Sequence, residues 1–439
     1  APYSIFKNVR KVGAGTYLEI KGKEIKENRY YSIPESSVNE SLSYDEAQKT
    51  LIQLLDKSVE RRLISDVPLG AFLSGGIDSS VIVALASKHT EHLNTFSIGY
   101  KDEPFFDETK YAELVADKYK TKHTTFSLSN DTLFENLFDI LNYIDEPFGD
   151  SSAIAVNILS KYTRKHVTVA LSGDGADELF AGYNKHAAEL KLRNPDFTLN
   201  LLKFASPLLS FLPKSRNSKF ANKIRQIDKF KSGMELTPRE RYWEWCSFVS
   251  ESSVNEMLNE KPDYDEYNRR KDDVLKYIRK GSGINDVLYS DMLNVLQNDM
   301  LVKVDMMSMA NSLEVRTPFL DYEVVNFAFS LPSDYKINSN MRKRILQDAF
   351  RNMLPEELYN RPKHGFEVPL LKWMKNELRS MIESDLLEDN YIKEQNIFNP
   401  VVINELKTRL FSTNPGDITA QIWTLIVFQY WWKKLMVNG

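Results

Sequence analysis

The sequence predicts an α/β protein with a doubly wound parallel sheet and a large helical C-terminal part. Three observations support this fold class. In the first 185 residues, short apolar segments alternate with amphipathic ones, as strands alternate with helices in such sheets. Two predicted strands end in glycine-rich turns that lead into helices, at residues 74–80 and 172–178. Beyond about residue 185 the strand pattern fades and the apolar spacing becomes mainly helical.

The first sixty residues contain a short β unit followed by a helix. Residues 16–20 alternate in polarity, residues 21–23 can turn, and Tyr30-Tyr31 closes the segment. Ser43 is followed three residues later by Glu46, which is the spacing of a capping box at a helix start. The apolar residues that continue this helix at helical spacing are Leu51, Leu54, Leu55, Val59 and Leu63.

The predicted sheet is built from strands and helices in alternation. Strands are expected at residues 67–73, 93–98, 123–126 and 166–171, and helices at residues 81–86, 107–118 and 132–143. Ligands of such sheets bind beyond the carboxyl ends of the strands. Both glycine-rich turns fall at that edge, so a binding site is expected there.

The first glycine-rich turn, Ser74-Gly75-Gly76-Ile77-Asp78-Ser79-Ser80, has the composition of an anion site. Glycines let backbone N–H groups approach a phosphate, the helix N-terminus adds positive dipole, and hydroxyls donate further hydrogen bonds. The turn lacks the G-x-x-x-x-G-K-[ST] order of a Walker A loop. The residues expected to hold a nucleotide are Leu73, Ser74, Gly75, Gly76, Asp78, Ser79 and Ser80 here, Ser97 and Gly99 at the next strand end, and Ser172 and Gly173 at the second turn.

The order S-G-G-x-D-S resembles the PP-loop of ATP pyrophosphatases, which cleave ATP between the α and β phosphates. Four ordered segments together resemble the C-terminal synthetase domain of the glutamine-hydrolysing asparagine synthetase family. They are residues 72–80, 171–183 (LSGDGADELFAGY), 308–321 (SMANSLEVRTPFLD) and 361–366 (RPKHGF). The likeness covers roughly residues 43–435. It implies a PP-loop fold, ATP and Mg²⁺ as cofactors, and transfer of AMP to a substrate carboxylate.

Two aspartates are expected to serve a magnesium ion. A carboxylate at Asp78 would repel ATP unless Mg²⁺ bridged the two, and Asp177 on the second turn is its natural partner. The alternative for Asp78 is a helix-start acid that only complements the dipole. The resemblance gives both positions to pyrophosphate-bound magnesium. For Asp174, where many relatives carry Glu, the resemblance implies a role in proton transfer or in orienting ammonia. The alternative is that Asp174 only stabilises the turn.

Other charged residues have weaker local signals. Lys363 alone would be a surface lysine, but the resemblance makes it the cation that neutralises charge during adenylation. Glu314, Arg316 and Asp321 are expected to form structural salt bridges, with substrate contact as the alternative. The acids in Asp145-Glu146-Pro147 are expected to line the acceptor pocket.

The family places a cysteine-initiated glutaminase domain before the synthetase domain. Residues 1–40 resemble only the last strands of that domain and a linker, and residues 41–439 the synthetase domain, with an ATP-binding core at 41–185 and a mainly helical part at 186–439. The single cysteine, Cys246, lies far from an N-terminus. Because the chain starts at Ala1, we expect truncation, with glutaminase activity supplied by the missing region or a separate chain; free ammonia is the alternative.

The predicted function is therefore an AMP-forming ligase. It would adenylate a carboxylate, preferably the side chain of L-aspartate, and then form an amide with ammonia. Alternatives are a sugar acid of surface-polysaccharide synthesis as acceptor, and an intramolecular amide closure of the β-lactam synthetase kind. A tRNA-modifying PP-loop enzyme and a non-catalytic scaffold are the rivals from other classes.

Composition excludes several other classes. A net charge of −4, no apolar run of 18 residues and one cysteine predict a cytoplasmic protein with no membrane, nucleic-acid or disulfide chemistry. The basic stretch at 214–231 is interpreted as a solvated helix face, against a nucleic-acid patch. Histidine spacing argues against zinc, and no G-x-S-x-G is present. Oligomeric state is left open, with a homodimer as one alternative.

Overall fold

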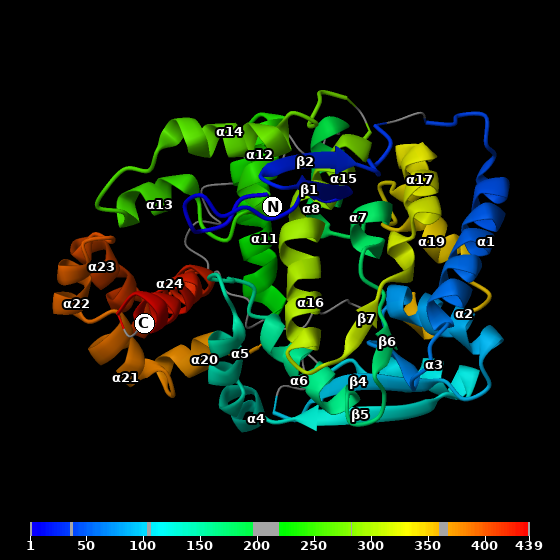
Figure 1. The fold of residues 1–439 in the computed structure, drawn as a ribbon, viewed down its shortest axis with the longest axis horizontal. Coiled ribbons are helices and arrows are strands. Elements are labelled where there is room, and N and C mark those ends of the chain that lie inside the picture. Colours follow the sequence, from blue (N-terminus) through cyan, green and yellow to red (C-terminus); the bar gives the residue numbers. More distant parts are fainter. Residues whose placement is uncertain are drawn as a thin grey trace. The chain divides into compact units, whose positions relative to one another are not determined.

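The computed structural model describes residues 2–35, 38–102, 107–195, 219–281, 283–359 and 368–437 (Figure 1). The chain forms two compact units, the first from residues 1–140, 152–187 and 283–367 and the second from residues 141–151, 188–282 and 368–439. The first unit is not limited to the core expected at 41–185, because a later segment returns to it and extends its sheet. The assignment of residues 1–40 to the end of a glutaminase domain stays a prediction.

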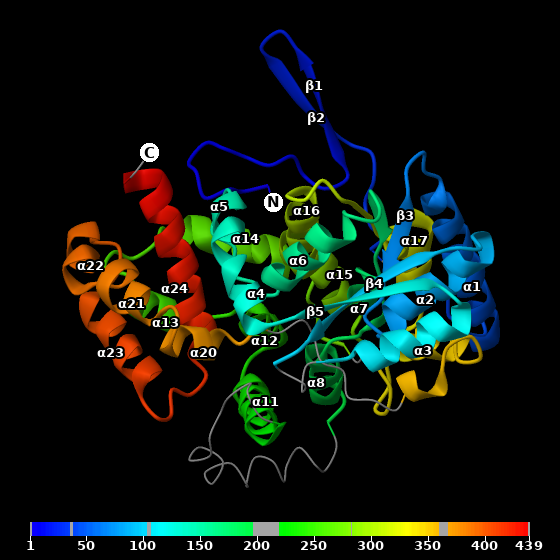
Figure 2. The same ribbon diagram turned by 90° about the horizontal axis from the view of Figure 1, so that it is seen from below.

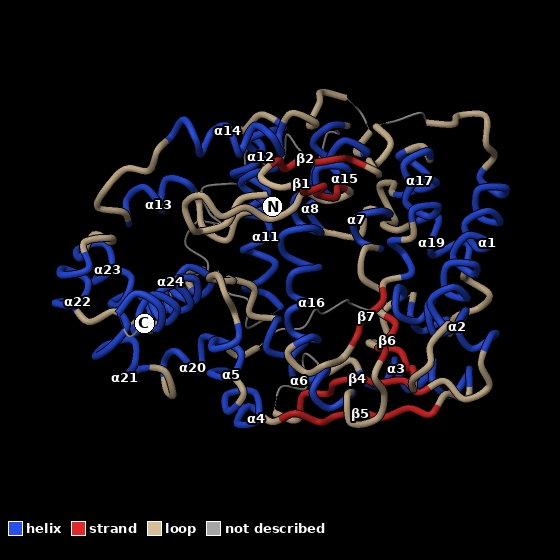
Figure 3. The backbone as a smooth tube through the Cα atoms, in the orientation of Figure 1, coloured by secondary structure: helices blue, strands red, loops and turns tan. Residues whose placement is uncertain are grey.

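The first unit contains a five-stranded sheet in the order β5-β4-β3-β6-β7, with every pairing parallel (Figure 3). The chain places β4 and β5 on one side of β3 and then crosses to the other side for β6 and β7. The predicted doubly wound parallel sheet is thus confirmed. Its strands are β3 (Leu69–Phe72), β4 (Asn94–Tyr100), β5 (Lys122–Leu128), β6 (Val169–Leu171) and β7 (Glu314–Arg316).

Two strands differ from the sequence prediction. β6 begins at Val169 rather than 166, because the amides of His166 and Val167 still bond to Thr163 O at the end of the preceding helix. β7 was not predicted, since its three residues carry no strand pattern of their own. It forms by pairing with β6, where Ala170 lies opposite Val315.

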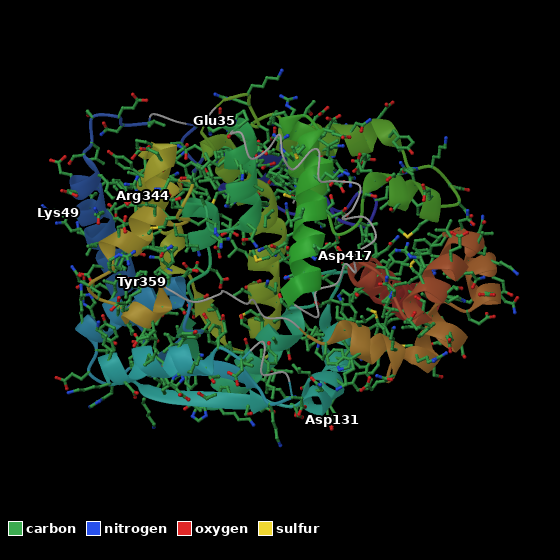
Figure 4. The ribbon with its side chains drawn as sticks, turned by 180° about the vertical axis from the view of Figure 1, so that it is seen from behind. Glu35, Lys49, Asp131, Arg344, Tyr359 and Asp417 are labelled. Atoms are coloured by element: carbon green, nitrogen blue, oxygen red, sulfur yellow. The ribbon has the colours of Figure 1, made fainter. Side chains whose placement is uncertain are left out.

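The helices of the first unit pack around this sheet. The capping box of Ser43 and Glu46 starts α1, as predicted. One face of α1 is buried, whereas Lys49 lies on its exposed face and points outward (Figure 4). α2 is buried on all sides from Ser79 to Ala86, which fixes its start at the carboxyl edge of β3. The helices are α1 (Tyr44–Leu63), α2 (Ile77–His89), α3 (Thr109–Tyr119), α4 (Asn130–Glu135), α6 (Ala153–Thr163), α7 (Ala176–Phe180), α15 (Asn285–Asp291), a π-helix (Met292–Met300), α16 (Leu301–Met309), α17 (Tyr322–Ser330), α18 (Ser333–Lys336) and α19 (Arg344–Ala349), with 3-10 turns at Pro318–Leu320 and Glu356–Leu358.

The single helix predicted at 132–143 is two helices, α4 and α5 (Leu137–Tyr143). The break lies at Asn136, whose side-chain amide donates to Thr132 O at 2.7 Å. Asparagine competes for backbone groups in this way and so favours helix ends over helix interiors.

The N-terminal hairpin is confirmed as β1 (Thr16–Lys21) and β2 (Glu24–Arg29), paired antiparallel around Lys21 and Glu24. It stands clear of the sheet of the same unit (Figure 2) and exposes several apolar side chains on both faces. The most exposed of these are Ile20, Ile25 and Tyr30.

The second unit is helical in its described residues. An aromatic-rich segment near the C-terminus forms α24 and the short π-helix that follows it. The start of the basic stretch at 214–231 lies outside the described residues. The helices are α8 (Asn184–Arg193), which starts in the first unit, α11 (Lys219–Met234), α12 (Pro238–Cys246), α13 (Glu251–Met257), α14 (Tyr264–Leu275), α20 (Leu370–Lys375), α21 (Arg379–Met381), α22 (Asp389–Gln395), α23 (Pro400–Phe411) and α24 (Thr419–Trp432), with π-turns at Ile382–Leu386 and Lys433–Val437. Across the described parts of the chain, no helix has the length and apolarity needed to cross a bilayer.

Candidate functional site

The two glycine-rich turns lie side by side at the carboxyl edge of the sheet. They follow β3 and β6, which are neighbours with Ala71 opposite Leu171. A Cβ on Gly173 would lie 2.8 Å from Ser79 N and 3.0 Å from the Asp78 Cβ, so the turns touch through a glycine. The sheet order reverses between these strands, and this is the point where doubly wound sheets bind their ligands.

The first turn is held in shape by its own glycine and hydroxyl groups. Gly75 has φ +70°, and a Cβ there would lie 2.6 Å from the Ala112 amide nitrogen of α3. The Ser79 hydroxyl accepts from Ser74 N at 3.2 Å and donates to Gly76 O at 3.2 Å, while Gly76 N donates to Ser74 Oγ. These bonds order the loop before any anion arrives.

The remaining residues expected to hold the nucleotide are mostly buried. Leu73 and Ser80 have no exposed surface, and Ser97 is 4% exposed. The Ser97 hydroxyl bonds to His123 Nε2 at 3.1 Å, so it is engaged within the sheet. Gly99 follows on the same strand, beside Asp107 and Thr109. Nucleotide contact by this group stays a prediction.

The second turn concentrates acidic groups in a largely buried place. The Ser172 hydroxyl donates to Asp174 Oδ2, while Asp174 N donates back to Ser172 Oγ at 3.2 Å. Burial raises the pKa of Asp174, and the nearby charge of Lys303 partly opposes this. Burial, assisted by the charge of Asp177, raises the pKa of Glu178 to about 8, and its Oε1 accepts from Tyr183 Oη at 2.6 Å.

One lysine joins the two turns. Lys343 Nζ lies 2.6 Å from Asp78 Oδ2 and 2.6 Å from Asp177 Oδ1. The side chains are 8%, 15% and 18% exposed respectively, so the ion pairs are weakly screened by water. This ionic centre, Asp78–Lys343–Asp177, brings the two predicted metal-binding aspartates to one point.

The backbone around the ionic centre is shaped to bring these groups together. Lys343 has φ 51°, a left-handed conformation that costs energy for a residue with a Cβ. Its amide donates to Phe180 O at 3.1 Å, which ties it to the end of α7. A Cβ on Gly182 would lie 1.7 Å from Asp177 Oδ1 and 2.1 Å from Lys343 Cε, so a larger residue there would have to displace these two side chains.

The ionic centre fits a magnesium ion bound with ATP. Two carboxylates that converge on one ammonium leave one net negative charge, and Mg²⁺ is commonly held by one or two carboxylates together with substrate phosphates. In the described residues no group of three or more histidine, cysteine or acidic side chains could hold a metal alone. The remaining ligands would therefore have to come from phosphate and water.

The other predicted residues lie elsewhere. Lys363 falls outside the described residues, so its role stays a prediction. Asp145 belongs to the second unit, where its carbonyl accepts from Trp431 Nε1 at 2.8 Å. Arg316 pairs with Glu314 at 2.6 Å and donates to carbonyls at the end of α1, and Asp321 pairs with Arg62 at 2.9 Å. These contacts match the expected structural role, although Asp321 pairs with α1 and not with Arg316.

Comparison with known proteins identifies the family. The family model described as asparagine synthase matches residues 50–433, which is most of the chain. The chain belongs to the asparagine synthase family. The resemblance predicted from the four sequence segments is thus confirmed.

Curated members of the asparagine synthase family show how far the likeness reaches. Glutamine-hydrolyzing asparagine synthetase 1 of Bacillus subtilis is 31% identical over 98% of this chain, and the match covers 66% of that protein. Asparagine synthetase 3 of the same organism is 26% identical over 82% of the chain and 55% of its own length. Amidase chyE of Penicillium rubens is 22% identical over 88% and 62%. The chain spans 55% to 66% of the length of these three relatives.

Sequence reasoning missed Lys343 and Lys303. Lys343 stands in a basic run, residues 342–344, with no motif to distinguish it from a surface lysine. Its partner Asp78 is 265 residues away in the chain, so only the fold shows the ionic centre.

Proposed function

We propose that this chain is the synthetase part of an AMP-forming, amide-forming ligase. It would adenylate a substrate carboxylate, most favourably the side chain of L-aspartate, and then amidate the acyl-AMP with ammonia to give asparagine and AMP. Magnesium would accompany ATP, and a glutaminase domain, in the same protein or a separate chain, would supply ammonia. Family membership and the site at the sheet edge support this proposal.

The observation that carries the proposal is the ionic centre Asp78–Lys343–Asp177 beside the glycine turn. A phosphate chain needs N–H donors, a cation and oxygen ligands for its metal, and these meet at the ends of β3 and β6. In this arrangement the β and γ phosphates would lie along residues 74–76 and the start of α2. Lys343 would hold the leaving pyrophosphate, and Asp78 and Asp177 would hold the magnesium ion that accompanies it.

Each residue has a distinct part in the first step. Bound Mg²⁺ would screen the phosphate charge and stabilise pyrophosphate as it leaves. The ammonium of Lys343 faces the same oxygens, and fixed positive charge aimed at developing negative charge lowers the barrier. An acceptor carboxylate oxygen attacks the α-phosphorus, the bond to the β-phosphate oxygen breaks, and the α-phosphate stays on the acceptor as acyl-AMP.

Asp174 is proposed to serve the second step. Ammonia attacks the acyl carbon, AMP leaves with the carboxyl oxygen, and the nitrogen loses a proton. Because burial raises the pKa of Asp174, its carboxylate is a better proton acceptor than an exposed aspartate. The Ser172 hydroxyl fixes the orientation of this carboxyl group. Lys363 is proposed as a further cation for the adenylation step.

The test is an acceptor screen with the 439-residue chain. The chain is supplied with ATP, magnesium chloride and ammonium chloride, and AMP, pyrophosphate and amide are quantified with L-aspartate, other carboxylic amino acids and uronic acids. We expect AMP, pyrophosphate and asparagine in equal amounts with L-aspartate. Turnover with a uronic acid but not with L-aspartate would show that the acceptor is a uronic acid. ADP and phosphate as products would contradict the AMP-forming ligase.

A further inference from the structure

Arg342, the residue before Lys343, fastens the turn between α7 and α8 at residues 181–184. Its Nη1 atom donates to Gly182 O at 2.8 Å and to Asn184 Oδ1 at 2.7 Å. The arginine and the glycine are 160 residues apart in the chain. One half-buried guanidinium therefore joins the segment that follows the acidic turn to the segment that carries the lysine of the ionic centre.

This turn is also the surface against which the Lys343 side chain lies. A Cβ on Gly182 would come within 2.1 Å of Lys343 Cε, so the aliphatic part of the lysine lies close to the glycine backbone. Gly182 N donates to Asp177 O at 2.8 Å, and Lys343 N donates to Phe180 O at 3.1 Å. A shift of the turn would therefore move the ammonium relative to the carboxylates of the ionic centre.

The backbone on both sides of this contact adopts costly conformations. Ala181 has φ 60° and Lys343 has φ 51°, both in the left-handed region that disfavours residues with a Cβ. Such conformations persist only where the surrounding contacts fix them. Arg342 supplies contacts of this kind between the two segments, and its own carbonyl accepts from Gln347 Nε2 at 2.6 Å in α19.

We propose that Arg342 is a positioning residue that holds the Lys343 ammonium in place for the leaving pyrophosphate. The inference rests on the proposed function, in which Lys343 faces that pyrophosphate. A fixed charge stabilises developing charge without reorganisation, and this requires its position to be held within about 0.5 Å. Arg342 acts through Gly182 and Lys343 and not through its own contact with substrate.

A double-mutant cycle tests whether Arg342 acts through Lys343. Binding of inorganic pyrophosphate to the 439-residue chain, with magnesium chloride present, is followed by ³¹P NMR. We expect Arg342→Met to weaken this binding about 10-fold in the wild-type background. In the Lys343→Met background the same change should weaken it about twofold or less, because the ammonium to be positioned is then missing.

Two milder variants keep the test decisive if Arg342→Met does not fold. Asn184→Ala removes one of the two acceptors from an exposed side chain, and it should weaken pyrophosphate binding about threefold. Arg342→Lys keeps the charge but has a shorter reach, so its affinity should lie between those of Arg342→Met and wild type. Thermal unfolding of each variant shows whether the protein is folded at the temperature of the binding measurement.

Arg344→Met is the matched control. Arg344 is half-buried like Arg342, and its Nη1 also donates to a backbone carbonyl, Asp334 O at 3.0 Å, but it lies over the Tyr44 ring of α1 (Figure 4). This variant should bind pyrophosphate within about twofold of wild type. A residue that only stabilises the fold would lower the unfolding temperature and leave the affinity of the folded chain unchanged.

Three results would overturn the inference. They are equal weakening by Arg342→Met in both backgrounds, unchanged binding in Asn184→Ala and Arg342→Lys, and no pyrophosphate binding by the wild-type chain. Pyrophosphate binding with the expected pattern but without AMP formation in the acceptor screen would count against the proposed ligase reaction alone. The two failures are therefore distinguishable.

Discussion

Two lysines seven residues apart are buried in different ways. Lys343 faces Asp78 and Asp177 at 2.6 Å each. Lys336 has no exposed surface, donates to Asn285 Oδ1 at 3.0 Å and lies 4.8 Å from the centre of the Phe329 ring. Burial lowers the pKa of Lys336 to about 7.

The difference separates two uses of a buried cation. In the ionic centre, the carboxylates of Asp78 and Asp177 balance the charge of Lys343. A phosphate can take their place beside the ammonium, and a metal ion can take the place of the ammonium beside the carboxylates. Among the described residues, an amide oxygen and an aromatic face meet the charge of Lys336, so proton loss relieves the burial cost. We therefore expect Lys343 to matter for chemistry and Lys336 for stability.

The largest expected effect comes from exchanging each lysine for methionine. Lys343→Met should lower the rate of pyrophosphate formation by about 10²- to 10³-fold, because it removes a preorganised positive charge that faces the leaving pyrophosphate. Lys336→Met should stay within about twofold of wild type, since no reacting group lies beside it. The measurement is steady-state pyrophosphate release with saturating ATP and the acceptor found in the screen.

The fold of Lys343→Met must be checked, because it leaves two buried carboxylates facing each other. Far-ultraviolet circular dichroism and thermal unfolding show whether the variant folds, and Lys343→Arg tests whether charge alone restores activity. Equal activity losses in the two methionine variants would contradict the separation of roles.

A smaller effect is expected in the pH dependence of stability. Because the pKa of Lys336 is near 7 when folded and near 10.5 when unfolded, the unfolded chain alone holds this proton between those values. The contribution of Lys336 to the free energy of unfolding should rise with pH in that window, by at most about 1.4 kcal/mol per pH unit. Below pH 7 this contribution should stay constant.

Chemical denaturation between pH 6 and 10 measures this effect. Lys336→Met should be more stable than wild type at pH 6, and the difference should shrink steadily above pH 7. Lys49→Met, on the exposed face of α1 (Figure 4), should follow the wild-type profile. A constant difference between Lys336→Met and wild type across this range would show that Lys336 does not titrate there.

Local sequence was sufficient for most of the sheet and for the position of the two glycine-rich turns at its carboxyl edge. Apolar strands followed by glycine turns predicted β3 and β6, and capping residues predicted the start of α1. β7 could not be predicted, because three residues form a strand only when β6 is beside them. Lys343 was missed for the same reason: its partners Asp78 and Asp177 lie far away in the chain, and nothing local marks this lysine.

The central claim is that an acceptor carboxylate attacks the α-phosphorus of ATP at the ionic centre. The direct measurement uses L-aspartate labelled with ¹⁸O in its side-chain carboxylate, with ATP, magnesium and ammonium, and mass spectrometry of the products. Attack by the carboxylate leaves one of its oxygens on phosphorus when ammonia displaces AMP. The account predicts AMP carrying one ¹⁸O. Label in inorganic phosphate together with ADP, or AMP without label, would contradict it.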